Sequence, residues 1–360
     1  MKKFLAMILA IVMVLSLAAC GAKAPAAEAP KAEAPAAEAP AAAPAEEAEF
    51  NPADHTIVYA TCNINHPVLR IIETGFATAC NELGYKWQIV GTEGTDANDM
   101  NAAAEAAAAA GADAILLMAE TETSIATVNS LASDYEVIVG VPHVHWEEGT
   151  MTGLSFCVAC DAVSYGKAVA EFMAERLEGK TGVIAVTESR YNEIEDAAAN
   201  SFIARIAELQ AEGKLAGVTV LDPAVEGCTD VTESTDVNAS IIQANPDIIG
   251  AFSTTGNGPL TWSNAARKCG YEPGELCIVS MDYTIDNLAE LEAGYVTAIV
   301  GQPLYQEAYA AVYYFDALLR GEEVAYWNEL EAPLIYKGGE GANDPATYAD
   351  ILASIDSVLG

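Results

Sequence analysis

The chain has 360 residues, with 16 lysines and arginines against 52 aspartates and glutamates, and a formal net charge of −36 at pH 7. A chain this acidic repels nucleic acid and has no basic patch for anionic lipid headgroups, so we exclude nucleic acid as a partner. Residues 54–360 amount to ~310 residues, which exceeds one typical core and favours two lobes.

Residues 1–21 resemble a bacterial lipoprotein signal. Lys2-Lys3 form a basic start, residues 4–17 form an apolar run, and Leu17-Ala18-Ala19-Cys20 places small residues before a cysteine. The run is shorter than the ~20 residues that span a bilayer, which disfavours a transmembrane anchor. The resemblance implies that residues 1–19 are a signal peptide. It also implies that Cys20 carries lipid, palmitate included, and anchors an extracytoplasmic protein to the cell membrane.

Residues 20–53 form a tether rather than a folded unit. They are rich in Ala, Pro and Glu, and the unit PAAEAP recurs. Repeated prolines block a continuous helix and favour an extended chain, which at ~3.1 Å per residue reaches roughly 80 Å. We expect a spacer between the lipid and the folded part.

From residue 56 the pattern alternates between strands and helices, which predicts right-handed βαβ units and parallel sheets. Strands are expected at 56–62, 86–90, 113–118, 136–141, 153–158, 182–187, 218–221, 248–252, 277–281, 296–300 and 333–336. Helices are expected at 67–83, 97–110, 123–132, 163–177, 194–210, 231–244, 259–268, 285–294, 303–319 and 345–358.

The pattern restarts after residue 160 and returns to the first half near residue 303. It predicts an α/β fold of two similar, doubly wound, parallel-sheet lobes with a hinge and a cleft. The N-terminal lobe is expected to comprise residues 54–160 and 303–331, and the C-terminal lobe residues 161–302 and 332–360. The chain should cross between lobes near 158–161, 299–302 and 330–333.

Polar side chains follow two strands of the predicted C-terminal lobe. Asp282 and Tyr283 come directly after strand 277–281, and Gln302 follows strand 296–300. In open α/β sheets, ligands bind outside the carboxyl ends of the strands. We therefore expect Asp282 and Gln302 to contact a ligand in the cleft.

Three of the four histidines also follow predicted strands: His66 follows the first, and His143 and His145 follow the fourth. Imidazoles there can donate and accept hydrogen bonds to a polar ligand. A His-x-His pair with a third histidine can also bind zinc, and plain loop structure is a further alternative. We predict ligand contact, with no metal and no cofactor.

Further candidates lie at the ends of other predicted strands. Aromatic rings there can stack on the C–H faces of sugars or on flat heterocycles, although core packing is an equal alternative. The carboxylates suit several hydroxyls or a cationic group and disfavour a phosphate or a dicarboxylate. These candidates are Asn65, Asp96, Glu120, Trp146, Tyr191, Thr255, Asn257 and Tyr283.

Several short stretches recur in a recognisable order between about residues 56 and 337. They are Asn65-His66-Pro67, Leu83-Gly84-Tyr85, residues 110–117 with Gly111 and Asp113, Asp161 with Gly166-Lys167, residues 279–282, and Gln302-Pro303. In this order they resemble the type I periplasmic sugar-binding proteins, of the ribose- and galactose-binding sort. The resemblance implies a periplasmic-binding-protein type I fold and a substrate-binding subunit of an ABC importer. Its partners would be permease subunits and a small polar ligand, a sugar foremost. Asp282 and Gln302 match the family's ligand-binding aspartate and glutamine.

The chain departs from that family pattern at three places. Val68 and Leu69 stand where ribose-binding relatives carry aromatic residues, and residues 142–146 stand where they carry an Asp-Arg pair. No arginine near residues 191–199 matches the one that clamps sugar hydroxyls. Nucleoside and cationic ligands therefore stay open beside sugars.

Two other classes of function compete with import. A lipoprotein of the same fold could sense a ligand and signal to a receptor kinase or a chemoreceptor, and the sequence does not separate the two. A metal receptor and an enzyme are less favoured. We find no nucleophile–base motif, and we predict a protein that is not an enzyme.

Overall fold

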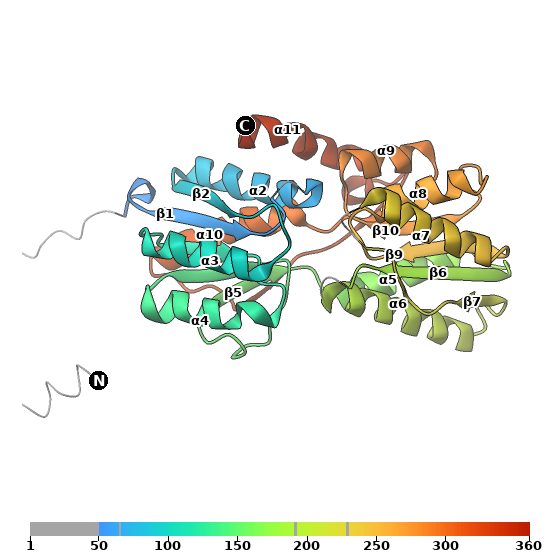
Figure 1. The fold of residues 1–360 in the computed structure, drawn as a ribbon, viewed down its shortest axis with the longest axis horizontal. Helices are drawn as coiled ribbons and strands as arrows, with labels where there is room; N and C mark the ends of the chain where they lie inside the picture. The colour runs from blue at the N-terminus through green and yellow to red at the C-terminus, as the bar shows by residue number, and fades with distance from the viewer. Residues whose placement is uncertain (1–49, 65, 191–192, 228–229) are drawn as a thin grey trace, which may run out of the picture. The chain divides into compact units, whose positions relative to one another are not determined.

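Two mainly parallel β-sheets form the frame of residues 50–360, as Figure 1 shows. The computed structural model describes residues 50–64, 66–190, 193–227 and 230–360. Residues 1–49, with Cys20, the predicted signal and most of the tether, lie outside them, as do Asn65 and Tyr191.

The first sheet has six parallel strands in the order β12-β5-β4-β3-β1-β2. Strands β1, β3, β4 and β5 are buried along almost their whole length, as the run of apolar residues in a central parallel strand predicts. The bounds are β1 Thr56–Thr61, β2 Lys86–Gly91, β3 Ala114–Leu117, β4 Ile138–Pro142, β5 Leu154–Ala159 and β12 Trp327–Glu329.

The second sheet runs in the order β13-β11-β10-β9-β6-β7, and β8 pairs with β6. All its pairs are parallel except β11 with β13, which is antiparallel. The bounds are β6 Gly182–Glu188, β7 Val218–Val220, β8 Ala224–Val225, β9 Ile248–Ser253, β10 Cys277–Met281, β11 Ala298–Val300 and β13 Leu334–Ile335.

Helices cover both sheets (Figure 1). Around the first sheet lie α2 Pro67–Leu83, α3 Ala97–Ala109, α4 Ile125–Asp134 and α10 Leu304–Leu319. With the second sheet lie α5 Ala162–Arg176, α6 Glu193–Ala211, α7 Val231–Ala244, α8 Gly258–Lys268 and α9 Ile285–Ala293. The C-terminal helix is α11 Ala349–Leu359, and four 3₁₀ turns are η1 Pro52–Asp54, η2 Glu122–Ser124, η3 Gly341–Asn343 and η4 Pro345–Tyr348.

Helix α2 shows how local sequence sets the bounds. Its cap is His66, whose ring nitrogen accepts a hydrogen bond from the Val68 N–H at 3.3 Å, and Pro67 occupies the first turn, where no N–H is needed. It ends at Gly84, which has a φ of 83° that few other residues adopt. The predicted range 67–83 is therefore confirmed.

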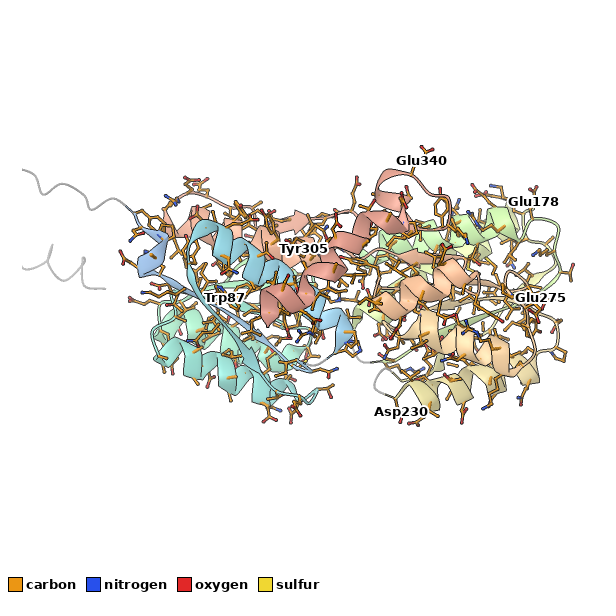
Figure 2. The ribbon with its side chains drawn as sticks, turned by 90° about the horizontal axis from the view of Figure 1, so that it is seen from above. Trp87, Glu178, Asp230, Glu275, Tyr305 and Glu340 are labelled. Atoms are coloured by element: carbon orange, nitrogen blue, oxygen red, sulfur yellow. The ribbon has the colours of Figure 1, made fainter. Side chains whose placement is uncertain are left out.

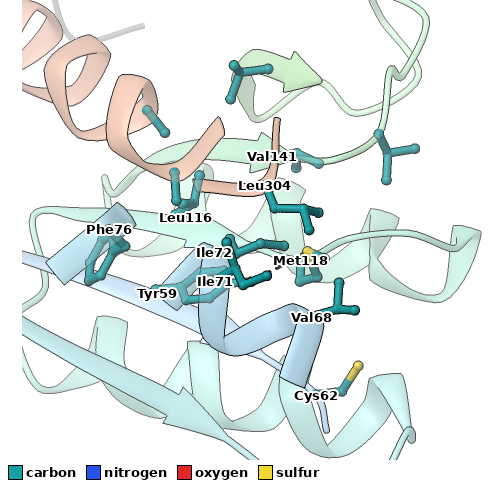
Figure 3. Packing of buried hydrophobic residues seen from close by; sticks show 14 of the residues in the cluster. Tyr59, Cys62, Val68, Ile71, Ile72, Phe76, Leu116, Met118, Val141 and Leu304 are labelled. Carbon is teal, nitrogen blue, oxygen red and sulfur yellow. Dashed lines mark hydrogen bonds between the residues drawn. The ribbon is translucent and has the colours of Figure 1, made fainter. Parts of the chain in front are cut away.

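The core of the first lobe lies between α2 and the sheet. Ile71, Ile72 and Phe76 of α2 are fully buried and face Tyr59 and Leu116, as Figure 3 shows. The rings of Tyr59 and Phe76 have their centroids 5.7 Å apart. Burying each side chain of this size stabilises the folded protein by ~1.5–3 kcal/mol. This packing holds the start of α2 beside the carboxyl ends of the strands.

The chain passes between the sheets three times. It leaves β5 for α5, leaves β11 for α10, and leaves β12 for β13, in the segments predicted to cross. Each connection is short, so the two sheets are joined by a few residues in each case. Such an arrangement is typical of hinged lobes.

The structure differs from the predicted elements at several places. Strands β8 and β12 were not predicted, because they have two and three residues and β12 carries polar Asn328 and Glu329 in an edge position. The helix expected at 123–132 begins as the 3₁₀ turn η2 and continues as α4. The C-terminal helix was expected with the C-terminal lobe, but α11 packs against α2 of the other lobe.

Tyr348 joins this C-terminal segment to the second lobe. Its ring packs on that of Tyr283 with centroids 4.3 Å apart, and its hydroxyl donates to the Ala342 carbonyl at 2.8 Å. We predict that Tyr348→Ala lowers the free energy of unfolding by about 3 kcal/mol, because a large buried ring is lost. Urea denaturation measures the change. Tyr135→Ala is the control, since Tyr135 is 42% exposed and should cost under ~0.5 kcal/mol. Equal losses for both variants would contradict the expectation.

Candidate functional site

A small cavity lies where the carboxyl ends of the two sheets meet, with a volume of about 90 Å³. The N-terminal lobe contributes residues that follow β1, β2, β3 and β4 and the start of α2. The C-terminal lobe contributes residues from the start of α6 and from the ends of β9, β10 and β11. The lining residues are Cys62, Asn63, His66, Val68, Leu69, Thr95, Met118, Glu120, His143, Ile194, Glu195, Thr254, Gly256, Met281, Asp282 and Gln302.

The two lobes approach closely at Gly256. A methyl group placed on Gly256 would lie 2.9 Å from Cγ2 of Val68 in the other lobe and 2.8 Å from Oδ2 of Asp282. Both distances are shorter than a normal contact between such atoms. A residue without a side chain is therefore needed here for the two lobes to close over the cavity in this arrangement.

Asp282 occupies the end of β10. Its N–H donates to the Val300 carbonyl at 3.0 Å, and its carbonyl accepts from Nδ2 of Asn287 at 2.8 Å. Asn287 also donates to the Gly256 carbonyl at 2.8 Å, so one buried amide holds the loops after β9 and β10 together. The side chain of Asp282 is thereby held toward the cavity.

The carboxyl group of Asp282 is almost fully enclosed. The residue is 4% exposed, and Oδ1 has no hydrogen-bond partner among the described residues. Burial and, to a smaller extent, the Glu307 carboxylate raise the pKa of Asp282 to about 7, against the lowering effect of His143. The site thus presents a buried acceptor that nothing in the described protein satisfies.

His143 and Glu307 form a pair beside Asp282. Nδ1 of His143 lies 3.1 Å from Oε2 of Glu307, whose side chain is fully buried. Burial alone would disfavour the imidazolium. The charge and hydrogen bond of Glu307, with smaller contributions from Glu120 and Asp282, outweigh it and raise the pKa of His143 to about 9. His143 is therefore a cation at neutral pH.

Two further carboxyl groups line the cavity. Glu195 accepts from the N–H and the hydroxyl of Ser189 at 2.7 and 2.5 Å. Burial raises the pKa of Glu195 to about 7, against the lowering effect of the Ser189 hydrogen bonds. Burial also raises the pKa of Glu120, with His143 lowering it and Glu307 raising it.

Three lining residues have backbone conformations that side chains disfavour. Asn63, His143 and Asp282 have φ angles of 51°, 72° and 69°, in the left-handed region. Such conformations cost about 1–3 kcal/mol each and concentrate at functional sites. The strain coincides with the polar groups that the strand ends direct into the cavity.

The structure brings five of the predicted site residues to this cavity. They come from both lobes and, apart from His66 at the start of α2, each follows a parallel strand. They are His66, Glu120, His143, Asp282 and Gln302.

Three predicted residues of the C-terminal lobe do not line the cavity. Tyr283 is fully buried against Tyr348, so core packing is its role. Thr255 turns away and donates its hydroxyl to the Glu226 carboxylate at 2.7 Å. Asn257 precedes α8 as its cap. A position just after a strand does not by itself predict whether a side chain points into the cavity or away from it.

Three predicted residues of the N-terminal lobe also lie elsewhere. Asp96 caps α3 by accepting from the Asn98 N–H at 2.9 Å. The exposed His145 stacks on Trp327 with centroids 4.3 Å apart, and Trp146 donates its ring N–H to the Ala119 carbonyl at 2.7 Å. Their polar atoms serve local structure, which the sequence pattern does not distinguish from ligand contact.

Sequence reasoning missed two acidic residues at the site. Glu195 lies near the start of α6, close in the sequence to the predicted Tyr191, and Glu307 lies one turn into α10 after Gln302. The signal for Glu307 was its position five residues beyond Gln302, which places both near the same strand end. Asn63 and Thr95, which follow β1 and β2, were also missed.

Among the described residues, no three His, Cys, Asp or Glu side chains are placed to hold a metal ion. Within the same ranges, no helix has the length and apolar character needed to cross a membrane.

Comparisons with known proteins agree with this architecture. Residues 57–323 match the family described as a periplasmic binding protein domain. Similar solved structures include GanP, a glucose-galactose binding protein from Geobacillus stearothermophilus, with 18% identity, a TM-score of 0.69, and coverage of 78% of this chain and 97% of that one.

Two other similar structures have comparable scores. A sugar-binding protein of a sugar ABC transporter from Bacillus halodurans has 18% identity and a TM-score of 0.70, covering 82% of this chain and 100% of that one. An ABC transporter solute-binding protein from Burkholderia graminis in complex with D-arabinose has 18% identity and a TM-score of 0.71, covering 80% and 97%. No curated protein matches the chain.

The buried carboxyl groups predict how stability depends on pH. The pKa values of Asp282 and Glu195 are about 7, above their ordinary values of 3.8 and 4.5, so the folded state holds protons that the unfolded chain releases. Stability must then fall as pH rises from about 4 toward 7. His143 acts in the same direction, since its contribution is complete below pH 6.5 and is lost as pH rises through about 9.

We therefore predict that the closed arrangement of the protein is more stable to urea at pH 5 than at pH 8. Asp282→Asn, which keeps the shape and removes the charge, should raise the free energy of unfolding at pH 8 by about 1–4 kcal/mol and flatten the pH profile. Asp286→Asn, an exposed neighbour, is the control and should change neither. A profile that rises from pH 5 to 8, or an Asp282→Asn protein no more stable than wild type at pH 8, would refute the assignment.

Proposed function

The chain belongs to the periplasmic binding protein family, and on that premise we propose that it is the extracytoplasmic substrate-binding lipoprotein of an ABC importer. It captures a small polar ligand, a sugar foremost, in the cavity between its lobes and delivers it to permease subunits in the membrane. Its role is binding rather than catalysis, as for the family.

One observation carries this proposal: the cavity at the carboxyl ends of both sheets is lined by polar groups from both lobes. Asp282 and Gln302 from one lobe are 4% and 1% exposed, so an enclosed ligand meets them in a nearly dry site. Glu120 and His143 from the other lobe line the same cavity. A ligand that satisfies them must contact both lobes, which couples binding to closure.

The ligand class is supported by the similar structures, which include glucose-galactose and arabinose binding proteins. Carboxylate, amide and imidazole groups accept and donate hydrogen bonds to hydroxyls, which fits a polyhydroxy ligand. The cavity of about 90 Å³ favours a small ligand over an oligosaccharide.

The first residues of the chain support membrane attachment. The lipoprotein signal and the Ala/Pro/Glu tether support a protein held near the permease by lipid on Cys20. A sensor of the same design is compatible with these features, and a permease gene beside this one would favour import.

We predict that Cys20→Ala moves the protein from the membrane fraction to the soluble fraction of cells that express the full chain, because the lipid acceptor is lost. Fractionation followed by immunoblotting measures the shift. Cys269→Ala, in the folded part, is the control and should leave the protein with the membrane. Membrane retention of Cys20→Ala would show that something other than lipid on this residue anchors the chain.

We also predict that Gln302→Ala weakens sugar binding by ~5- to 150-fold, the equivalent of leaving a buried partner unpaired. Calorimetric titration with D-galactose, D-glucose and D-arabinose measures the change against wild type. Gln243→Ala on the exposed face of α7 is the matched control. Unchanged affinity in Gln302→Ala would place the ligand elsewhere.

A further inference from the structure

The cavity carries more negative than positive groups. Glu120, Glu195 and Asp282 line it, and Glu307 lies behind His143. No lysine or arginine is among the described lining residues. Two arginines that are close in the sequence to lining residues pair with acidic residues outside the lining: Arg190 with Glu188 at 2.9 Å, and Arg70 with Asp356 at 3.9 Å.

Histidine supplies too little charge to balance these carboxyl groups. Burial lowers the pKa of His66, so its ring is neutral near pH 7. His143 is cationic, but its Nδ1 is committed to Oε2 of Glu307. The described lining residues therefore offer Asp282 no cation other than the His143 imidazolium, which is already paired with Glu307.

Two buried carboxyl oxygens mark where a bound cation would be stabilised. Oδ1 of Asp282 and Oε1 of Glu307 are enclosed and have no hydrogen-bond partner among the described residues. An enclosed carboxylate without a partner costs several kcal/mol unless it is protonated or meets a cation. Asp282 faces the cavity, so a group bound there can reach it.

The residues that line the cavity limit which kind of cation can bind there. A bare metal ion needs several close ligands, and no three such side chains in the described ranges are placed together. Quaternary ammonium groups bind over aromatic rings, and the described lining residues include no Phe, Tyr or Trp. An ammonium with N–H donors suits carboxylates instead, because each N–H makes a charge-assisted hydrogen bond.

We infer that the ligand of this cavity is a protonated amine on a small polyhydroxy frame, such as an amino sugar or an iminosugar, with its ammonium directed at Asp282. This inference rests on the proposed function and specifies its ligand class. The hydroxyl groups of the ligand donate hydrogen bonds to the side chains of Glu120, Glu195 and Gln302. The raised pKa of Asp282 accords with a buried carboxyl group whose Oδ1 has no hydrogen-bond partner among the described residues.

Calorimetry with matched probes tests the inference. D-galactosamine and the iminosugar 1-deoxygalactonojirimycin carry the charge at two positions, and D-galactose and N-acetyl-D-galactosamine are their neutral counterparts. At least one charged probe should bind ~10-fold or more tightly than both neutral ones at pH 7.5 in low salt, because hydrogen bonds to a charged group are roughly twice as strong.

The variant Asp282→Asn should remove this preference and bring charged and neutral probes within ~3-fold of each other. Asp286→Asn, exposed and four residues away, should keep it. Cation binding should also release protons at pH 7, seen as a different heat in phosphate and in Tris. The groups that face Asp282 and set this release are Glu307 from α10, His143 after β4, Glu120 after β3 and Glu195 from α6.

The possible failures are distinguishable. If the neutral sugars bind as tightly as the charged ones, or if the preference survives in Asp282→Asn, the inference is overturned while the sugar-binding function stands. If neither charged nor neutral probes bind, the polyhydroxy ligand class fails, and the inference falls with it.

Discussion

The burial of unbalanced carboxyl groups at the carboxyl ends of two parallel sheets is the constraint on which the rest of the site depends. Parallel strands bring side chains from distant parts of the sequence to one edge, and two such edges face one cavity. Placing Asp282 and Glu307 in that enclosed space makes the closed arrangement costly without a ligand. We propose that a bound ligand relieves this cost and so favours closure of the two lobes.

Hydrogen bonds within the C-terminal lobe hold the site in this unfavourable state. Asn287 ties the Asp282 and Gly256 carbonyls together. The buried Glu226 accepts hydrogen bonds from Ser253, Thr255 and Asn238, and so fixes the loop after β9. The acidic exterior has a different basis: Glu178, Asp230, Glu275 and Glu340 extend into solvent from the second lobe (Figure 2), where charge costs little.

The sequence predicted the alternation of elements well, because buried parallel strands and capped helices have strong local signals. Helices 67–83 and 231–244 and strand 277–281 have the predicted bounds. It predicted the site in part: Asp282 and Gln302 follow strands, and strand ends converge in any such fold. It did not separate Thr255 from Thr254, or His145 from His143, because the direction of a loop side chain depends on backbone angles such as the φ of 72° at His143. Glu307 was missed because its role depends on contact with a residue 164 positions away.

We propose that the two lobes close over the ligand. Small-angle scattering of the full folded part, with and without the tightest-binding sugar or amino sugar, measures this closure. We expect the radius of gyration to fall on saturation in wild type. In Gly256→Trp, whose side chain must displace Val68 from the other lobe, the radius of gyration should stay at the ligand-free value. A radius of gyration that does not change in wild type at saturation would refute closure.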